Sequence, residues 1–561
     1  MTDTLARTGG PADASLPDVV TAKAPVRWLA DPATAFSEAA LRARLLGPRW
    51  SWATTPASLR IWFWLLPALT AAIGGVLRFV RLGQPDSLVF DETYYVKDAY
   101  SLLQSGYERA WPDKANDHFN VGDFSVLQNT PEYVVHPPVG KWMIAFGMWL
   151  FGPSNTFGWR FTAAVVGTVS IFVLALIAQR MFRSTLLGGI AGLLFAVDGH
   201  AIVMSRTSVL DIFVMFFALL AFGALLLDRD DGRRRLAARL AKARSRNPGH
   251  DGGALGYGPW LGMRWWRLAA AVSLGLCTGT KWSGLFFLAG FGLMSVFWDL
   301  GARRAAGIRY WFSAGVFKDG LPALVTVVPV AAATYLASWT GWFLSSNAYD
   351  RHWADRNPAG PWGWIPAPLR SLWHYHTTAY AFHTGLDSDH PYKANAWSWL
   401  VMGRPTSFYA DYPTQGHKGC SVSECASVVT SLGNPAIWWS ATLAAVFLIV
   451  YWAAKRDWRA GGILAGMASG FLPWLLYPDR TIFFFYAIAY EPYLILGLVM
   501  VLGLILGRPA DPPWRRQQGM LMVGIFLVVA VLVSAYFYPL WTDELISRQD
   551  WQNHMWMPSW V

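Results

Sequence analysis

Two adjacent carboxylates, Asp91 and Glu92, lie in the segment Phe90-Asp91-Glu92-Thr93-Tyr94-Tyr95, about ten residues beyond the first long apolar stretch of the chain. A carboxylate pair just outside such a stretch can act as a general base or bind a cation. The same pair also suits the acidic first turn of a helix running through Asp98 to Leu103. Taken alone, it leaves both interpretations open.

A second segment, His136-Pro137-Pro138-Val139-Gly140-Lys141, opens an apolar stretch that ends at Phe151 and is too short to cross a bilayer. We expect a helix lying in the membrane interface. The prolines would start it, because a proline in the first turn loses only an N–H that has no partner there. His136 and Lys141 could then face a lipid phosphate, and snorkelling of Lys141 toward water is an equal alternative.

Five further ionisable residues stand at the rims of apolar stretches: Arg160, Arg206, Asp211, Lys281 and Arg480. Charges at membrane depth are costly, so they usually pair with one another or line a cavity. Several cations converging beside a carboxylate pair would suit an anionic lipid head group. For any one of them, anchoring at the interface is an equal alternative.

A long polar loop, residues 345–435, holds more than half of the chain's histidines and many aromatic residues. Its rings suit sugar or peptide contacts, while a Trp-rich loop on the membrane surface is an equal alternative. No set of four ligands stands out as a metal site. The candidates are His374, His376, His383, His390, Trp397 and Trp399.

The elements that position these residues follow from composition. Of 561 residues, 54% are hydrophobic and 14% charged, whereas soluble domains carry about 25% charged residues. Because a helix needs about 20 apolar residues to cross the hydrocarbon, we predict an all-α polytopic membrane protein with about eleven transmembrane helices. The expected spans lie near residues 61–80, 158–178, 186–204, 209–227, 264–280, 282–298, 320–344, 436–454, 460–476, 480–506 and 518–538.

The net charge of +11 comes from basic clusters between these spans rather than from a nucleic-acid surface. Cytoplasmic connections are enriched in Lys and Arg, and one orientation places every cluster inside. It makes residues 1–60 a cytoplasmic tail and residues 61–344 a transmembrane module. The loops 81–157 and 345–435 are then external, and residues 436–561 form the last helices and an external tail.

Cysteine usage adds one expectation about the second external loop. Cys420 and Cys425 lie five residues apart in it, while Cys277 falls in an apolar run. A disulfide between the loop cysteines is plausible on an oxidising side of the membrane.

Together, the motifs resemble the protein O-mannosyltransferase family, whose members have the GT-C membrane fold. The resemblance runs from about residue 60 to 540. It rests on Phe90-Asp91-Glu92-Thr93-Tyr94, His136 to Lys141, Gly158-Trp159-Arg160-Phe161, Ser205 to Phe217, Gly279 to Gly284, Phe382 to Leu386, His390-Pro391-Tyr392 and Trp397-Ser398-Trp399. Eukaryotic members insert a β-trefoil MIR domain in a large lumenal loop. Residues 345–435 have no room for one, which favours the bacterial branch.

The resemblance implies transfer of mannose from a polyprenyl-phosphate donor to Ser or Thr hydroxyls of secreted or membrane proteins, with inversion, outside the bacterial plasma membrane. A hydroxyl needs a positioned proton acceptor, a role we assign to Asp91. Arg160 is expected to hold the donor phosphate, because a guanidinium fork matches phosphate oxygens. Lys281 and Arg480 are weaker candidates. Glu92 would orient the acceptor or pair with Arg160.

No cofactor is expected. A divalent cation at Asp91 and Glu92 is not favoured, because arginine and lysine can supply the positive charge. Besides the lipid donor, the protein acceptor and the bilayer, the protein secretion channel is a candidate partner, and nucleic acid is not. Two rival functions stay open: a GT-C transferase that moves arabinose or aminoarabinose onto a glycan or lipid, and a multi-pass transporter, whose sites tend to lie at mid-membrane.

Overall fold

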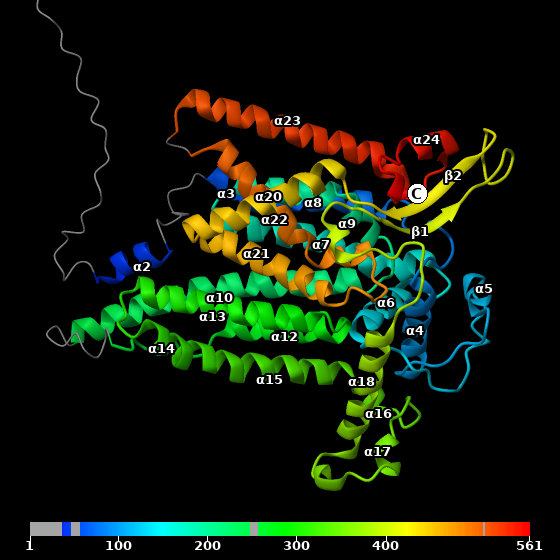
Figure 1. The fold of residues 1–561 in the computed structure, drawn as a ribbon, viewed down its shortest axis with the longest axis horizontal. Coiled ribbons are helices and arrows are strands. Elements are labelled where there is room, and N and C mark those ends of the chain that lie inside the picture. Colours follow the sequence, from blue (N-terminus) through cyan, green and yellow to red (C-terminus); the bar gives the residue numbers. More distant parts are fainter. Residues whose placement is uncertain (1–35, 47–56, 247–255, 509–510) are drawn as a thin grey trace, which may run out of the picture.

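The computed structural model describes residues 36–46, 57–246, 256–508 and 511–561 (Figure 1). Within these ranges, seven helical segments are long and apolar enough to cross a membrane. They are α3 (Ala57–Phe79), α7 (Thr156–Phe182), α10 (Asp211–Arg246), α13 (Gly284–Ala305), α14 to α15 (Trp311–Ser338), α20 (Pro435–Lys455) and α23 (Pro513–Phe537) with the turn that follows it. The chain is therefore a mostly helical membrane protein.

Four of the predicted spans fall on shorter helices, α8 (Thr185–Val197), α12 (Trp265–Thr280), α21 (Trp458–Phe471) and α22 (Glu491–Leu506), which lie alongside the long ones (Figure 1). The span predicted at 480–506 begins late, because residues Phe484–Ala489 form a 3-10 turn before α22. The span predicted at 320–344 divides into α15 (Leu321–Ser338) and α16 (Thr340–Leu344).

The break after α8 has a polar cause. Asp198 caps the short helix α9 (Gly199–Met204), accepting a hydrogen bond from the backbone N–H of His200 at 2.9 Å. Its second oxygen accepts from the N–H of Asn434, at the start of α20, at 3.0 Å. A carboxylate that ties two chain segments together in the core thus ends a helix that hydropathy alone would continue.

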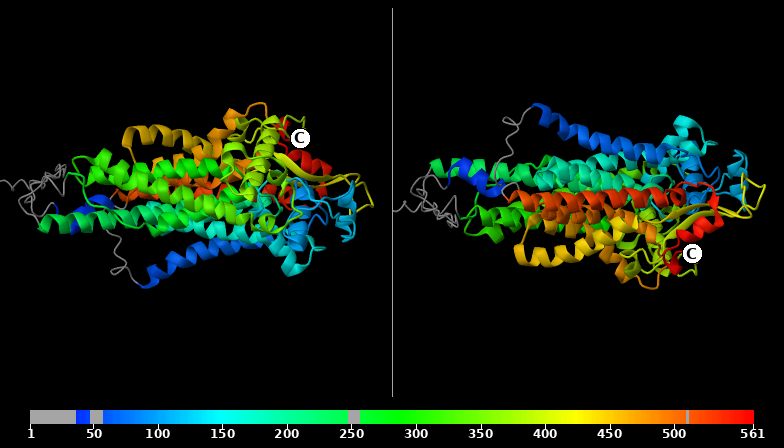
Figure 2. Two further views of the ribbon diagram at one scale, coloured as in Figure 1. Left: turned by 90° about the horizontal axis from the view of Figure 1, so that it is seen from below. Right: turned by 90° about the horizontal axis from the view of Figure 1, so that it is seen from above.

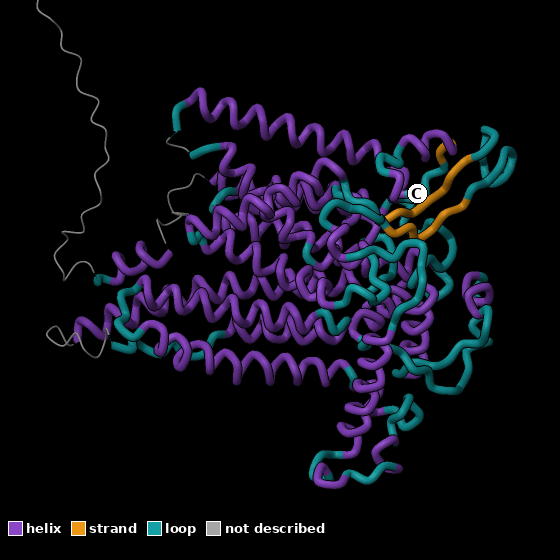
Figure 3. Tube along the Cα trace, viewed as in Figure 1, coloured by secondary structure: helices purple, strands orange, loops and turns teal. Residues whose placement is uncertain are grey.

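The helices form an elongated bundle with different structure at its two ends. Figures 1 and 3 show loops, strands and short helices gathered at one end, and Figure 2 shows the same from two further sides. This end carries α4 (Glu92–Ser105), α5 (Ala115–Asn120), α6 (Val139–Phe151), α17 (Trp353–Arg356), α18 (Ala367–Gly385), α19 (Ala396–Trp399) and α24 (Arg548–Asn553). The opposite end carries α2 (Glu38–Leu46), α14 (Trp311–Gly315) and the last turns of α10. The segments predicted as external thus share one end.

A small antiparallel sheet covers part of that end. Its order is β1 (Thr406–Asp411), β2 (Cys425–Ser431), β3 (Ile546–Ser547). Thr406 pairs with Ser431 and Asp411 with Ser427, with a bulge between Ser407 and Tyr409. The second external loop and the C-terminal segment therefore fold together.

Candidate active site

Asp91 stands between the loop that leaves α3 and the first turn of α4. The residue before it, Phe90, has φ of 45°, a conformation that is strained for a bulky side chain and persists only where packing enforces it. The Phe90 ring stacks on Phe408 of β1 at 5.0 Å and meets the edges of Phe483 and Phe485 within 5.6 Å. Aromatic packing therefore holds the backbone that presents Asp91.

The carboxylate of Asp91 is half-buried, and the Tyr95 hydroxyl donates to it at 3.4 Å. Burial raises the pKa of Asp91 to about 6, with Asp211 adding to the rise and Lys281 opposing it. Such a group is ionised at neutral pH and yet close to taking up a proton, as a general base requires.

Glu92 occupies a different environment although it is the next residue. Both of its oxygens accept from Arg160, at 2.9 Å from Nε and 2.8 Å from Nη2, and both side chains are fully buried. The backbone N–H groups of Val89 and Ser208 donate to the same carboxylate. Glu92 therefore pairs with Arg160, the second of the roles expected for it.

The remaining N–H groups of Arg160 donate to the carbonyls of Leu82, Pro85 and Ser87, in the loop that leads from α3 to Asp91. A phosphate could reach this guanidinium only if bonds to protein acceptors broke first. The arrangement thus gives Arg160 a structural role in clamping the Asp91 loop. Its predicted contact with donor phosphate stays a prediction that this geometry does not favour.

Lys281, directly after α12, brings a cation to the same end. Its ammonium donates to both oxygens of Asp211, at 3.1 and 2.9 Å, and lies 4.3 Å from the centre of the Tyr486 ring. Burial opposes the charge most strongly, but Asp211, Tyr486 and Asp91 together outweigh it, so the pKa of Lys281 is raised. Lys281 is therefore a cation held beside Asp91.

A pocket of about 200 Å³ opens next to Lys281. The His136 and His383 rings stack at 5.1 Å on its wall, and Arg480 donates to the His383 carbonyl at 3.0 Å. The pocket is lined by His136, Lys281, Trp282, Ser283, Leu285, Phe286, Tyr380, His383, Thr384, Trp474, Tyr477 and Arg480. It thus joins two cations and two imidazoles contributed by four distant stretches of chain.

The protonation of His383 follows from its partners. Its Nε2 lies 2.9 Å from the carbonyl oxygen of Val135, which can only accept, so Nε2 carries the hydrogen. Nδ1 then accepts from Arg480 Nη2 at 3.3 Å. Burial lowers the pKa of His383 to about 4, so the ring is neutral and the positive charge in this pocket resides on Lys281 and Arg480.

Several predicted residues lie apart from this pocket. Lys141 is fully buried and bonded to Glu108 at 2.5 Å, with Asp98 at 3.6 Å, so it neither snorkels nor faces a lipid. Arg206 donates to the backbone carbonyls of residues 78, 80 and 81 and stabilises the end of α3. Both predictions overlooked partners far away in sequence.

The loop candidates divide in the same way. His376 bonds to the Tyr335 hydroxyl at 2.6 Å and lies 5.4 Å from the ring of Trp282 on the pocket wall, whereas His374 stacks on Trp353 at 4.1 Å. Trp399 is fully buried, whereas Trp397 is exposed. His390 lies closer to the site, with its ring 5.9 Å from Phe90.

The sequence reasoning missed Tyr95, Trp282 and Tyr486, which contact the central groups. Tyr95 and Trp282 lie in the same sequence motifs as Asp91 and Lys281, so those motifs were a signal that could have identified them. Tyr486 ends the aromatic run Phe483-Phe484-Phe485-Tyr486, which reads as an ordinary apolar span.

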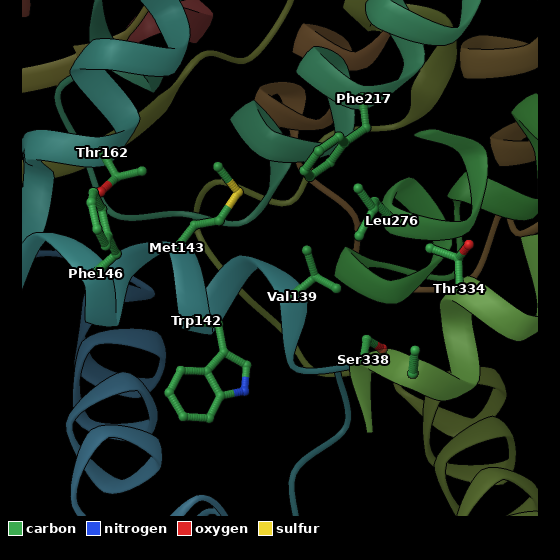
Figure 4. A pocket seen from close by; sticks show the side chains of 10 residues that line it. Val139, Trp142, Met143, Phe146, Thr162, Phe217, Leu276, Thr334 and Ser338 are labelled. Carbon is green, nitrogen blue, oxygen red and sulfur yellow. The ribbon is translucent and has the colours of Figure 1, made fainter. Parts of the chain in front are cut away.

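A second, apolar pocket of about 560 Å³ lies among α6, α7, α10, α12 and α15 (Figure 4). It is lined by Val139, Trp142, Met143, Phe146, Thr162, Phe217, Leu276, Thr334, Ala337 and Ser338. Near its rim α6 approaches α12 closely, since a side chain at Gly279 would stand 2.8 Å from Val139. The same two stretches of chain line both pockets, since Val139 and Leu276 line the apolar one and His136 and Lys281 the charged one.

Cys420 and Cys425 form a disulfide in the turn between β1 and β2, and Cys277 is buried and free. Within the described ranges, no group of three or more His, Cys, Asp or Glu side chains is arranged to hold a metal ion.

Comparison with known proteins places these features in a family. Residues 135–238 match the model of dolichyl-phosphate-mannose-protein mannosyltransferase, and residues 368–560 match that of the C-terminal four TMM region of protein-O-mannosyltransferase. The polyprenol-phosphate-mannose–protein mannosyltransferase of Mycolicibacterium smegmatis (strain MKD8) is 38% identical over 513 residues, covering 89% of this chain and 93% of that protein. The one from Mycobacterium tuberculosis (strain ATCC 25618 / H37Rv) is 37% identical over 510 residues, covering 89% and 92%.

The fold has a counterpart among solved structures. The S. cerevisiae protein O-mannosyltransferase Pmt1-Pmt2 complex bound to the sugar donor superimposes with a TM-score of 0.67 at 15% identity, covering 93% of this chain and 94% of that chain. At that identity the likeness shows a shared fold.

Proposed function

The chain belongs to the protein O-mannosyltransferase family, and from this premise we propose how its loop-bearing end transfers mannose from polyprenol phosphate to protein. Asp91 is the general base. The acceptor Ser or Thr oxygen attacks the anomeric carbon, its proton passes to Asp91, and the bond from that carbon to the phosphate oxygen breaks. A single displacement inverts the anomeric centre.

The leaving phosphate gains negative charge as the bond breaks, and cations fixed near that charge lower the barrier. We assign this role to Lys281 and Arg480 because both line the pocket beside Asp91, whereas Arg160 is engaged by Glu92. Neutral His383 keeps Arg480 in place through two hydrogen bonds. The observation that carries the proposal is this pocket of two cations next to a half-buried carboxylate with a raised pKa.

The apolar pocket bordering Gly279 suits the prenyl chain of the donor. Seven of its ten lining residues are apolar, and the other three carry only hydroxyl groups (Figure 4). A lipid whose chain enters there could place its phosphate near Lys281. We further propose eleven membrane crossings in a bacterial plasma membrane, with the N-terminus cytoplasmic and Asp91 outside.

A direct assay tests the proposal. Purified protein in lipid is given polyprenyl-phosphate mannose and a Thr-rich peptide, and mass spectrometry reads the peptide for added mannose. Parallel reactions carry polyprenyl-phosphate arabinose or aminoarabinose, or a lipid acceptor. We expect mannose on the peptide alone. Transfer of another sugar, or mannose on the lipid acceptor, would favour the rival transferases.

A further inference from the structure

An arm, residues 345–385, leaves the loop-bearing end of the bundle crosswise. It contains α17, the 3-10 turn Gly360–Trp362 and α18. Figure 1 shows α18 running across the direction of α15, beyond the side of the bundle and level with the end of that helix. Because the spanning helices cross the membrane, an element perpendicular to them at their ends lies along the membrane surface.

The two faces of α18 differ. One face is buried: Leu372 and Tyr375 pack with Trp339 and Trp342 in a separate hydrophobic cluster. The other face exposes Leu369, Trp373 and Tyr380, which follow helical spacing and form one stripe. Trp373 is 72% exposed, and Trp362 and Trp364 in the preceding turn are 61% and 77% exposed.

The stripe carries no free charge of its own. Arg370, next to Leu369, donates to the backbone carbonyls of Asn357 and Ile365. His374 stacks on Trp353 and lies 3.6 Å from Asp350. The stripe itself is therefore aromatic and uncharged, the composition that gathers at the boundary between lipid and water, while the exposed charged residues Asp355 and Arg356 of the arm lie on α17.

We propose that the aromatic stripe of the arm docks on the outer leaflet of the bilayer and so holds the donor pocket at the level of the lipid head groups. The stripe consists of Trp362, Trp364, Leu369, Trp373 and Tyr380. Its perpendicular course, its level at the ends of the spans and its composition favour a lipid surface over a protein partner.

The arm reaches the pocket through the far end of α18. Tyr380, His383 and Thr384 line the pocket. Halfway along, the Tyr375 hydroxyl donates to the carbonyl of Val134 at 2.6 Å and accepts from its N–H at 3.0 Å. With the bond from His383 to the Val135 carbonyl, α18 fixes the segment that leads into His136. An arm docked on the membrane would thus fix the positions of both pocket histidines, His136 and His383. This coupling between docking and the pocket rests on the proposed function.

The docking itself is measurable without activity. The native cysteines are buried or disulfide-bonded, so a thiol introduced at Trp364 or Trp373 can be labelled selectively with an environment-sensitive fluorophore. In vesicles containing nitroxide lipids, we expect strong quenching at both positions and little at Gln415, an exposed residue in the turn after β1. Labels at Trp364 and Trp373 that respond only to a water-soluble quencher would overturn docking on lipid, and quenching lost on adding a second protein would favour a protein partner.

The coupling has a kinetic signature. For the double variant Trp364→Ser/Trp373→Ser, we expect the KM for a long-chain donor in vesicles to rise severalfold, with turnover of a short-chain, detergent-soluble donor unchanged. The matched control is Trp514→Ser, 61% exposed at the opposite end of the bundle. Equal losses with both donors, or no change in KM, would overturn the coupling. Absence of mannose transfer by the unaltered protein would instead defeat the proposed function and leave the quenching result intact.

Discussion

Asp91 and Glu92 are chemically similar neighbours with different environments. Glu92 accepts four hydrogen bonds, including a bidentate pair from Arg160, and is wholly buried. Asp91 has one long contact to Tyr95 and a half-open position. A saturated carboxylate has no lone pair left for a substrate proton, whereas the other does, so environment separates the structural acid from the candidate base.

Asp91→Asn keeps the size of the side chain but removes the proton acceptor. We expect turnover to fall by about 10²–10⁴-fold, while affinity for the lipid donor changes little. Asp113→Asn, an exposed acid in the same external loop, is the matched control. Single-turnover transfer on purified protein measures the effect, and a full-rate Asp91→Asn enzyme would show that another group takes the proton.

The pH dependence follows from the raised pKa of about 6 at Asp91, caused chiefly by burial. The base must be ionised, and protonation increases as pH falls through the pKa. We therefore expect kcat/KM to be level above pH 7 and to fall about tenfold per pH unit well below pH 6. Rates from pH 4.5 to 8 with a Thr-rich peptide test this. A fall centred at pH 4, the region of an unperturbed carboxyl, would contradict it.

Substitutions of Arg160 and Arg480 should have different effects on stability and donor binding. Arg160→Ala leaves Glu92 buried without its partner. Removing one partner of a buried ion pair lowers the free energy of unfolding by about 3–5 kcal/mol, so the unfolding temperature should drop. Arg160→Lys should recover only part, because an ammonium lacks the fork. Arg480→Ala should keep that temperature and raise the KM for the donor. Thermal unfolding and donor titration distinguish them; a stable Arg160→Ala protein with weak donor binding would restore its phosphate role.

At the scale of single residues, local sequence identified which ionisable groups matter but not their partners. Arg160 was expected at the donor phosphate, and Lys141 and Arg206 were candidates to face a lipid head group; they bond to Glu92, to Glu108 and to the end of α3. These pairings join segments 33 to 128 residues apart, and no local pattern encodes them. Lys281, directly after α12, and Arg480 do line the pocket.

At the scale of elements, hydropathy located the helices and missed their breaks. Apolar runs predict where a segment is buried, but α8 ends where Asp198 binds Asn434, more than 200 residues away. The turn Phe484–Ala489 likewise interrupts an apolar run, and it places Tyr486 against Lys281. Both interruptions are accompanied by contacts with distant residues that only the folded chain makes.

The hairpin between β1 and β2 offers a prediction at this scale. Its disulfide closes a small ring, so its stabilisation should lie at or below the lower end of the usual roughly 2–4 kcal/mol, and neither cysteine lines the pocket. We expect Cys420→Ser/Cys425→Ser to insert normally and keep measurable mannose transfer. The single variant Cys277→Ser, in the buried core, serves as a comparison. Complete loss of transfer in a well-inserted double variant would assign the thiols a further role.

At the scale of the whole molecule, charge and structure divide between the two ends. The described part of the basic segment Arg233–Arg246 ends α10 at one pole, while Asp91, the sheet and the arm occupy the other (Figure 1). Hydropathy and charge were enough to predict this division, because the cost of moving Lys and Arg through hydrocarbon acts on every loop. The enrichment of Lys and Arg in cytoplasmic loops predicts that the basic pole faces the cytoplasm.

Membrane-impermeant thiol labelling of intact cells decides the orientation. In a background without native cysteines, single cysteines replace Ser421, exposed in the hairpin turn, and Ser245, exposed near the end of α10. We expect Ser421→Cys to react from outside and Ser245→Cys to react only after the membrane is opened, because the arginines around residue 245 resist translocation. Labelling in permeabilised cells controls for reactivity at both sites. The reverse pattern would place Asp91 in the cytoplasm, where emerging secreted acceptors could not reach it, and would remove the proposed mechanism along with the orientation.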